Sequence, residues 1–450
     1  MIDTAPVVRR VVDPLKEFLH AEAASGLVLL AATGAAVGWA NSPLANAYEA
    51  LWGHELTLGF GPVVITENLR QWVNDGLITL FFFVVGLEIK RELVTGEMRE
   101  PRRAALPALA ALGGMVVPAA VFLLVNADGQ DARGWGIPIA TDTAFALGVL
   151  ALLGSRVPTT AKMFLLALAI VDDIFAITVV AVFYSGEITV EWLAIALSGV
   201  ALVVVLRWFG VCAISAYLPL GLLVWAATLH SGVHATIAGV AFGLLTPARP
   251  VRGRPVLEQL ERRLHPVSSY LVVPVFALAN AGVLLNVDAL RAAVASPVAR
   301  GVALGLLVGK VIGITGASVA AVRLRIGTLP EGLTIRHVVG LAALAGIGFT
   351  VSLFVAELAY AGNGLIELAK VGILVGSLVS GMAGAALLMR TGRPGGGVRP
   401  GSGEVPARLA PAPLQQCLPG AGGSWPDRRC NNDRMCRPRR VDFRAMPARA

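Results

Sequence analysis

The sequence predicts an all-α polytopic membrane protein, because of its composition, the length of its apolar segments and the placement of its basic residues. Of its 450 residues, 56% are hydrophobic and 15% are charged, whereas an average soluble domain has about 25% charged residues. A soluble core cannot bury that much apolar surface. Many apolar blocks reach the length of about 20 residues that crosses a hydrocarbon layer of about 30 Å. The bilayer is therefore the expected solvent.

About twelve segments are predicted as transmembrane helices. They cover residues 17–40, 72–92, 104–125, 136–154, 160–184, 189–208, 211–229, 232–247, 266–286, 299–322, 334–360 and 366–389. When the loops alternate between two sides, the basic residues gather on one side, including Arg102, Arg249 and Arg325. The positive-inside rule makes this side cytoplasmic. We therefore expect a multi-pass protein of the bacterial inner membrane with both termini inside.

The ends of the chain differ from this membrane domain, residues 17–390. Residues 1–16 form a predicted cytoplasmic N-terminus, and residues 391–450 are rich in Gly, Pro and Arg without periodicity, which predicts a disordered cytoplasmic tail. A net charge of +8 can indicate a nucleic-acid partner, but the basic residues lie in short loops. We expect membrane lipid as the surrounding partner and no nucleic acid.

Residues 55–66 are predicted to form a short periplasmic β-hairpin. The stretch HELTLGFGPVVITENL alternates weakly and contains the turn residues Gly-Phe-Gly-Pro at 59–62. An irregular loop is the alternative. If the protein is a homodimer, a hairpin with a free edge can join the two copies by adding strands to its twin.

Two of the spans are predicted to be discontinuous helices. In span 136–154, Pro138 and the triplet Thr141-Asp142-Thr143 precede an apolar run, and Thr141 and Asp142 are suitable helix caps. In span 334–360, Gly346, Gly348 and the potential cap Thr350 occur at a comparable depth. Irregular backbone at membrane depth occurs only where it is buried in protein or lines a cavity.

Interruptions in corresponding halves of a transporter indicate its binding site. Spans three to five and ten to twelve would then be two inverted repeats. The ends of the half-helices carry partial charges. Asp142 and Lys310 are the residues available to offset these charges.

Asp172 and Asp173 lie near the middle of the otherwise apolar span 160–184. Each ionised carboxylate there costs at least about 2.5–3.5 kcal/mol. A structural ion pair is the simplest alternative, but Lys310, taken as the one lysine deep in an apolar span, cannot neutralise Asp142, Asp172 and Asp173 together. Neighbouring helical residues point about 100° apart, so one aspartate can face a cavity and the other an adjoining helix.

Carboxylate oxygens suit both a hard cation such as sodium and a proton. Competition between the two ions for one site, with alternating access, suffices for exchange. A sodium-coupled solute symporter shares broken helices and buried acids, but it needs a pocket for its solute. An intramembrane aspartyl protease also uses two aspartates. Such proteases resemble a pattern with the aspartates on separate spans, whereas here the two are adjacent.

Seven ordered segments between about residues 17 and 390 resemble NhaA-type sodium/proton antiporters. They are GLEIKREL (86–93), IATDTAFALGVLALLG (139–154), AIVDDIFAI (169–177), SGVHATIAGV (231–240), LHPVSSY (264–270), FALANAGV (276–283) and GIGFTVSLF (346–354). The resemblance implies a secondary transporter rather than an enzyme, without a cofactor. It implies electrogenic, pH-regulated exchange of two protons for one sodium or lithium ion by a dimer. The tail after Arg390 has no counterpart in this pattern.

The resemblance also implies roles for residues of the broken-helix region. By motif position, Asp173 is the principal cation ligand, Asp172 its partner and proton carrier, and Thr141 an additional ligand. Asp142 and Lys310 would balance the dipoles of the crossed helices, and Lys310 would also pair with Asp172 when the ion is absent.

Four further residues match positions that the family associates with its pH response: Glu88, Arg91, His234 and Glu261. Two of them have simpler interpretations. His234, between Val233 and Ala235 at a span end, suits a hydrogen-bonded packing residue. Glu88 suits an ordinary interfacial ion cluster with Lys90 and Arg91.

Overall fold

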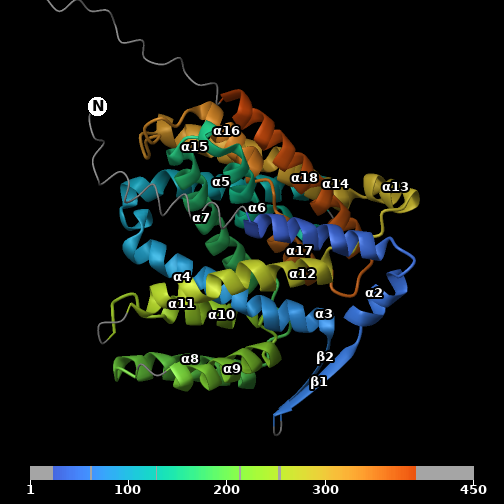
Figure 1. Cartoon of the computed structure of the whole chain (residues 1–450), viewed down its shortest axis with the longest axis vertical. Coiled ribbons are helices and arrows are strands. Elements are labelled where there is room, and N and C mark those ends of the chain that lie inside the picture. Colours follow the sequence, from blue (N-terminus) through green and yellow to red (C-terminus); the bar gives the residue numbers. More distant parts are fainter. Residues whose placement is uncertain (1–23, 61–62, 128, 212–213, 252–254, 392–450) are drawn as a thin grey trace, which may run out of the picture. The chain divides into compact units, whose positions relative to one another are not determined.

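The computed structural model describes residues 24–391 except 61–62, 128, 212–213 and 252–254 (Figure 1). It confirms a mostly helical, multi-span protein. The predicted N-terminus, the tail beyond Thr391 and residues 17–23 of the first span lie outside the described residues.

Among the described residues, five helical segments are long and apolar enough to cross a membrane, and they coincide with predicted spans. Four are single helices, α5 (Pro101–Val125), α7 (Thr159–Phe183), α8 (Val190–Trp208) and α18 (Leu365–Thr391). The fifth segment, Pro297–Arg323, comprises α14 (Pro297–Leu304), the π-helical turn η6 (Gly305–Gly309) and α15 (Lys310–Arg323).

Three further segments are pairs of shorter helices with a bend between them. They are helix Ala24–Ala40 with α2 (Ala45–Trp52), bent by 115°, η3 (Asp131–Ile139) with α6 (Thr143–Leu153), bent by 40°, and α16 (Ile335–Leu344) with α17 (Phe349–Ala359), bent by 49°. The second and third pairs confirm the predicted breaks in spans 136–154 and 334–360. With each pair taken as one span, the described residues contain up to eight candidate spans.

The four other predicted spans consist of shorter or interrupted helices, so the total of twelve stays a prediction. These helices are η1 (Trp72–Leu77), α4 (Ile78–Thr95), α9 (Ile214–His230), α10 (Thr236–Leu245), α11 (Val256–Val267), η5 (Ser268–Val272) and α12 (Val273–Asn280). Short connecting elements are α3 (Leu69–Gln71), η2 (Glu97–Arg99), η4 (Gly154–Arg156) and α13 (Val287–Ala295).

The predicted hairpin is confirmed, and the alternative of an irregular loop is wrong. Strands β1 (Glu55–Phe60) and β2 (Val63–Asn68) pair antiparallel, with Glu55 opposite Asn68. The second strand extends beyond the predicted end at Thr66, because Glu67 and Asn68 still find partners on β1. Across the pair, the hydroxyls of Thr57 and Thr66 lie 3.0 Å apart.

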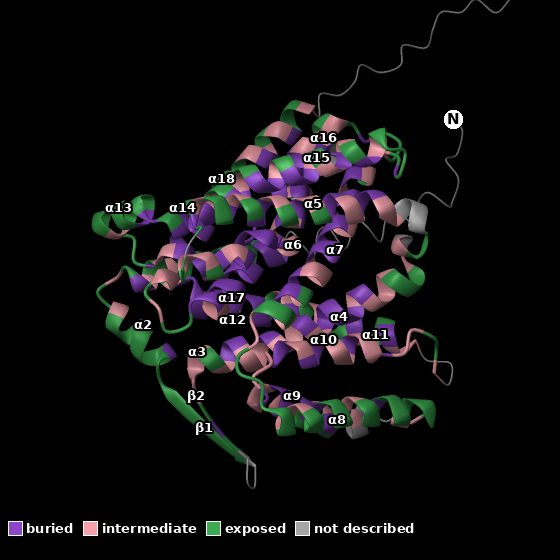
Figure 2. Cartoon of the chain, turned by 180° about the vertical axis from the view of Figure 1, so that it is seen from behind, coloured by how far each residue is buried: buried purple, intermediate pink, exposed green. Residues whose placement is uncertain are grey.

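The broken helices lie inside the helical assembly, and close helix packing holds them there. Figure 2 shows α17 largely buried and α6 buried or half-buried over most of its length, whereas α8 is largely exposed. Helices α5 and α15 touch through backbone, since a Cβ on Gly113 would collide with the carbonyl of Gly313 and the reverse also holds. Small residues permit such close approach between membrane helices. This contact brings Lys310, the first residue of α15, beside α5 and the first break.

Candidate functional site

Asp142 joins the two helix breaks. Its Oδ1 accepts a hydrogen bond from the backbone N–H of Phe145 (3.1 Å), which makes it the N-cap of α6. Its Oδ2 accepts from the backbone N–H (3.0 Å) and the hydroxyl (2.6 Å) of Thr350, at the start of α17. Its own N–H donates to the carbonyl of Ile347 (2.6 Å). One carboxylate therefore satisfies amides of two helix N-termini, whose partial positive charges favour an anion.

Lys310 lies at the same break, at the C-terminal end of η3. Its Nζ donates to the carbonyl of Ile139 (2.6 Å), the hydroxyl of Thr141 (3.0 Å) and Oδ2 of Asp172 (2.6 Å). Ile139 is the last residue of η3, where helix carbonyls carry partial negative charge. The ammonium is fully buried, so each of its three donors has an acceptor in place of water. The structure places Lys310 beside Asp172, the residue with which the resemblance implies that it pairs.

Asp172 is the buried member of the adjacent pair, with 1% of its side chain exposed. Its Oδ2 lies within 2.6 Å of both Lys310 Nζ and Thr141 Oγ1. Its Oδ1 is buried and has no hydrogen-bond partner within the part of the chain that the structure describes. Thr141 also approaches the carbonyl of Ala345 (2.9 Å). Thr141 does not cap α6, contrary to the expectation, because its hydroxyl points toward Asp172 and the second break.

Asp173 is the next residue, yet it has different surroundings. It is half-buried and lines a cavity of about 80 Å³ together with Thr141, Asp142 and Thr350. One water molecule needs about 10–15 Å³ of cavity volume, so this cavity has room for several water molecules. The expected division is confirmed, since one aspartate faces a cavity and the other faces α15.

The cavity extends to a group of charged residues that includes three of the four predicted pH-response positions. Glu88 and Arg91 line it, as does His265. His265 Nε2 lies 3.5 Å from Glu88 Oε1, and Arg91 Nη1 donates to Glu261 Oε1 at 2.5 Å. Burial raises the pKa of the Glu261 carboxyl, and the guanidinium of Arg91 and the imidazole of His265 offset part of this rise. These contacts join α4 to α11.

His234, the fourth position, lies elsewhere and does not line this cavity. Its Nε2 is 2.6 Å from the carbonyl of Tyr184, and its ring meets that of Phe354 edge-on. This placement fits the simpler interpretation of a hydrogen-bonded packing residue.

The second break requires its glycines. A Cβ on Gly346 would collide with the carbonyl of Leu306 and the hydroxyl of Ser380. Gly348 is the N-cap residue of α17, and its N–H donates to Ser377 Oγ (3.2 Å). Thr350 is therefore not the cap that the sequence suggested. It lies inside α17, and its hydroxyl is used by Asp142.

Sequence reasoning missed a second buried lysine. Lys370, near the start of α18, is 2% exposed, so Lys310 is not the only buried lysine among the described residues. Its Nζ lies 3.0 Å from Glu357 Oε1 and 3.4 Å from Glu367 Oε1. A lysine near the end of a span ordinarily extends to the membrane interface. The position of Lys370 in the sequence therefore did not predict its burial. The acidic Glu357 inside the preceding predicted span was the available signal.

Comparisons with known proteins identify the family of this chain. The sequence model of the family described as Na⁺/H⁺ antiporter 1 matches residues 16–388. The "Na(+)/H(+) antiporter NhaA 3" of Frankia alni is 44% identical, with 91% of this chain and 96% of the relative covered.

Two other relatives agree with this match. The "Na(+)/H(+) antiporter NhaA 1" of Erythrobacter litoralis is 47% identical, with 84% of this chain and 93% of the relative covered. The "Na(+)/H(+) antiporter NhaA" of Shewanella amazonensis is 46% identical, with 82% and 95% covered. The chain thus belongs to the Na⁺/H⁺ antiporter 1 family and is a transporter rather than an enzyme.

Proposed function

We propose that this chain exchanges sodium or lithium ions for protons across the bacterial inner membrane, electrogenically and under the control of pH. The observation that carries this proposal is the unequal environment of two adjacent carboxylates. The Asp172 side chain is buried in an ion pair with Lys310, whereas Asp173 borders a cavity. A carboxylate that meets the cavity can accept an arriving cation, and its buried neighbour can accept or release a proton.

The contacts of Lys310 suggest how cation and proton compete. Asp173 would be the principal ligand, with Thr141 and Asp172 adding oxygen donors of the type that hard cations prefer. Lys310 now donates to Thr141 Oγ1 and Asp172 Oδ2. A sodium ion that uses these oxygens must displace the ammonium. Two carboxylates can also carry two protons, which suits the exchange of two protons for one sodium ion.

Alternating access would use the two breaks and the two inverted repeats. The first repeat would comprise α5, the η3–α6 pair and α7, and the second would comprise α14–α15, the α16–α17 pair and α18. The placement of both breaks around Asp142, and the backbone contact of α5 with α15, support this arrangement. Breaks in corresponding places of two halves are typical of transporter sites. Twelve spans with both termini in the cytoplasm complete the proposal.

The pH response would involve Glu88, Arg91 and Glu261, at the cavity end of α4 and α11. Protonation of Glu261 removes the charge with which it pairs with Arg91. Since Arg91 also lines the cavity, this change alters the electrostatic field that an entering cation meets.

Family membership supports exchange over the other two functions. The adjacent aspartates also disagree with a protease, and a symporter would show transport that depends on an organic solute. Measurement of sodium-driven proton movement in everted vesicles, with and without candidate solutes, separates symport from exchange.

The decisive variant is Asp173→Asn, assayed by fluorescence dequenching in everted vesicles at several pH values. We expect exchange to be lost while the amount of protein in the membrane stays unchanged, because the amide removes the negative charge that attracts both ions. The matched control is Asp288→Asn, whose side chain is 92% exposed on α13. Sodium-dependent proton movement by Asp173→Asn would overturn the assignment.

A further inference from the structure

Helix α18 contacts the broken helix α17 at both of its ends. Lys370, Ser377 and Ser380 share one face of α18, because residues three, four and seven apart lie on the same side of a helix. Ser377 Oγ accepts from the N–H of Gly348, the N-cap of α17, and Ser380 lies against Gly346. Lys370 reaches Glu357, in the last turn of α17. The polar face of α18 therefore holds α17 at its start and at its end.

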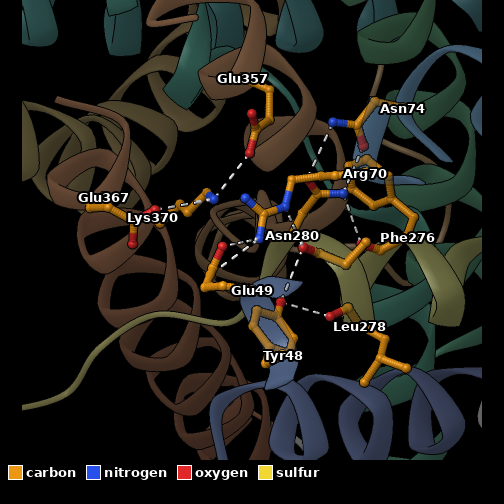
Figure 3. A network of polar contacts seen from close by, with 11 residues as sticks. Tyr48, Glu49, Arg70, Asn74, Phe276, Leu278, Asn280, Glu357, Glu367 and Lys370 are labelled. Atoms are coloured by element: carbon orange, nitrogen blue, oxygen red, sulfur yellow. Dashed lines mark hydrogen bonds and ion pairs between the residues drawn. The ribbon is translucent and has the colours of Figure 1, made fainter. Parts of the chain in front are cut away.

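The contact at the end of α17 has one ammonium and two carboxylates. Figure 3 shows Lys370 extending between Glu357 and Glu367. The side chain of Lys370 is 3% exposed, that of Glu357 is 17% exposed and that of Glu367 is 52% exposed. Glu357 belongs to α17, whereas Glu367 belongs to the first turn of α18 itself. Lys370 can thus pair across the two helices or within its own helix.

Other basic groups in Figure 3 are engaged elsewhere. Arg70 Nη2 lies 3.2 Å from Glu49 Oε2, and its Nε donates to the carbonyl of Ala279 (3.2 Å). Among the described residues, Lys370 is the cation that pairs with Glu357. A carboxylate at a helix C-terminus is unfavourable without such a cation, because the last carbonyls carry partial negative charge. Release of Lys370 from Glu357 would free the end of α17.

Movement at that end reaches the ion site, because α17 is short. Thr350, in its first turn, donates two hydrogen bonds to Asp142, which also caps α6. When α17 tilts, Thr350 moves with it, and the geometry around Asp142 therefore changes. Glu367 offers Lys370 a second partner during that tilt, so the buried ammonium need not lose its counter-charge.

We propose that Lys370 is a positioning residue for ion exchange, which contacts both Glu357 and Glu367 in one orientation of α17 and only Glu367 in the other. This inference rests on the proposed function. In the present structure Lys370 bridges α18 to α17 while the cavity beside Asp173 is formed. In the orientation of α17 seen here the ammonium contacts both Glu357 and Glu367, and in the other orientation it would keep Glu367 and lose Glu357.

The test compares Glu357→Gln with Glu367→Gln, a matched pair in which each variant loses one carboxylate beside Lys370. Exchange is measured in everted vesicles, which present the predicted cytoplasmic face to added sodium, as an apparent KM and a maximal rate. A bias of the two orientations should change apparent affinity by about fivefold or more. Glu367→Gln should lower the KM and the maximal rate, because it keeps Lys370 on Glu357. Glu357→Gln should raise the KM.

Two further variants separate positioning from packing. Lys370→Arg keeps the charge and should retain the normal KM. Lys370→Met removes the charge, so in its background Glu357→Gln and Glu367→Gln should no longer change the KM in opposite directions. If both glutamine variants shift the KM in the same direction, or change only thermal stability, the positioning role is overturned. Absence of sodium-driven proton movement in the unsubstituted protein would instead contradict the proposed function itself.

Discussion

The two buried lysines show how depth changes the use of an ion pair. Lys310 is fully buried against Asp172, whose side chain is 1% exposed, and its other donors meet a carbonyl and a hydroxyl. Lys370 is nearly as buried, but its partners Glu357 and Glu367 are 17% and 52% exposed. In the first pair neither charge can reach water, whereas in the second the carboxylates can.

This difference determines what can separate each pair. Loss of one partner from a fully buried pair leaves an uncompensated charge, which costs about 3–5 kcal/mol. Lys310 and Asp172 can therefore part only when another cation or a proton takes the place of the ammonium. Lys370 can change partners without such an exchange, because a second carboxylate is already within 3.4 Å. The first arrangement suits coupling to an ion, and the second suits movement of a helix.

The largest expected effect is the loss of stability in Lys310→Gln. We expect about 3–5 kcal/mol, from the uncompensated Asp172, and a smaller loss in the matched variant Lys370→Gln, whose carboxylates can be hydrated. Thermal unfolding of both proteins in detergent measures the difference. If Lys310→Gln and Lys370→Gln lose equal stability, the ion pairs of the two lysines are equally desolvated and do not differ in the way argued above.

The same variant tests whether Lys310 carries a transported proton. We expect Lys310→Gln to retain electrogenic exchange with unchanged stoichiometry, since Asp172 and Asp173 can carry two protons between them. The measurement is the reversal potential in proteoliposomes. A shift to the electroneutral value would make the lysine an obligatory proton carrier and would contradict a purely structural role.

A smaller effect is expected at the junction of the two breaks. Thr350→Val removes a hydroxyl that donates to the Asp142 carboxylate at 2.6 Å, and a hydrogen bond to a charged group contributes about 1.5–3 kcal/mol. Ser377→Ala removes a neutral acceptor at the same break and should cost about 1 kcal/mol. Thermal unfolding ranks the two variants. A greater loss in Ser377→Ala would indicate that α18, rather than Asp142, holds the start of α17.

The next effect concerns pH and not stability. Burial raises the pKa of Glu261, so its negative charge, and its pairing with Arg91, form only as the pH rises through that raised value. Glu261→Gln keeps residue 261 uncharged at every pH, so Arg91 never gains this carboxylate partner. The half-maximal pH of exchange should therefore move to the alkaline side by about half a unit or more. If dequenching measurements give an unchanged pH profile, the contact between Glu261 and Arg91 is an interfacial ion pair and not part of the pH response.

The smallest effect on transport is expected from the hairpin, which lies outside both lysine sites. If β1 and β2 pair with those of a second copy, deletion of residues 55–66 should give monomers that still exchange ions. Light scattering of the purified protein measures its mass, and the vesicle assay measures its transport. If the deletion leaves the dimer population unchanged, the hairpin is not part of the dimer interface.

Features that depend on local composition could be predicted from the amino-acid sequence. Blocks of apolar residues identified the spans, because each must satisfy its backbone within one helix in lipid. Gly346 and Gly348 indicated the second break, and Asp142 was recognised as a helix cap. The adjacent aspartates in an apolar span indicated the ion site, because their burial has no local compensation.

Which distant groups compensate one another became apparent from the packing of the helices. It placed one carboxylate, Asp142, at the starts of both α6 and α17, and it directed Thr141 toward Asp172 instead of its own helix. It also buried Lys370 beside Glu357, which a span boundary could not predict. The physical reason is that helix propensity and hydropathy fix local conformation, whereas close packing between helices brings each buried charge to its partner.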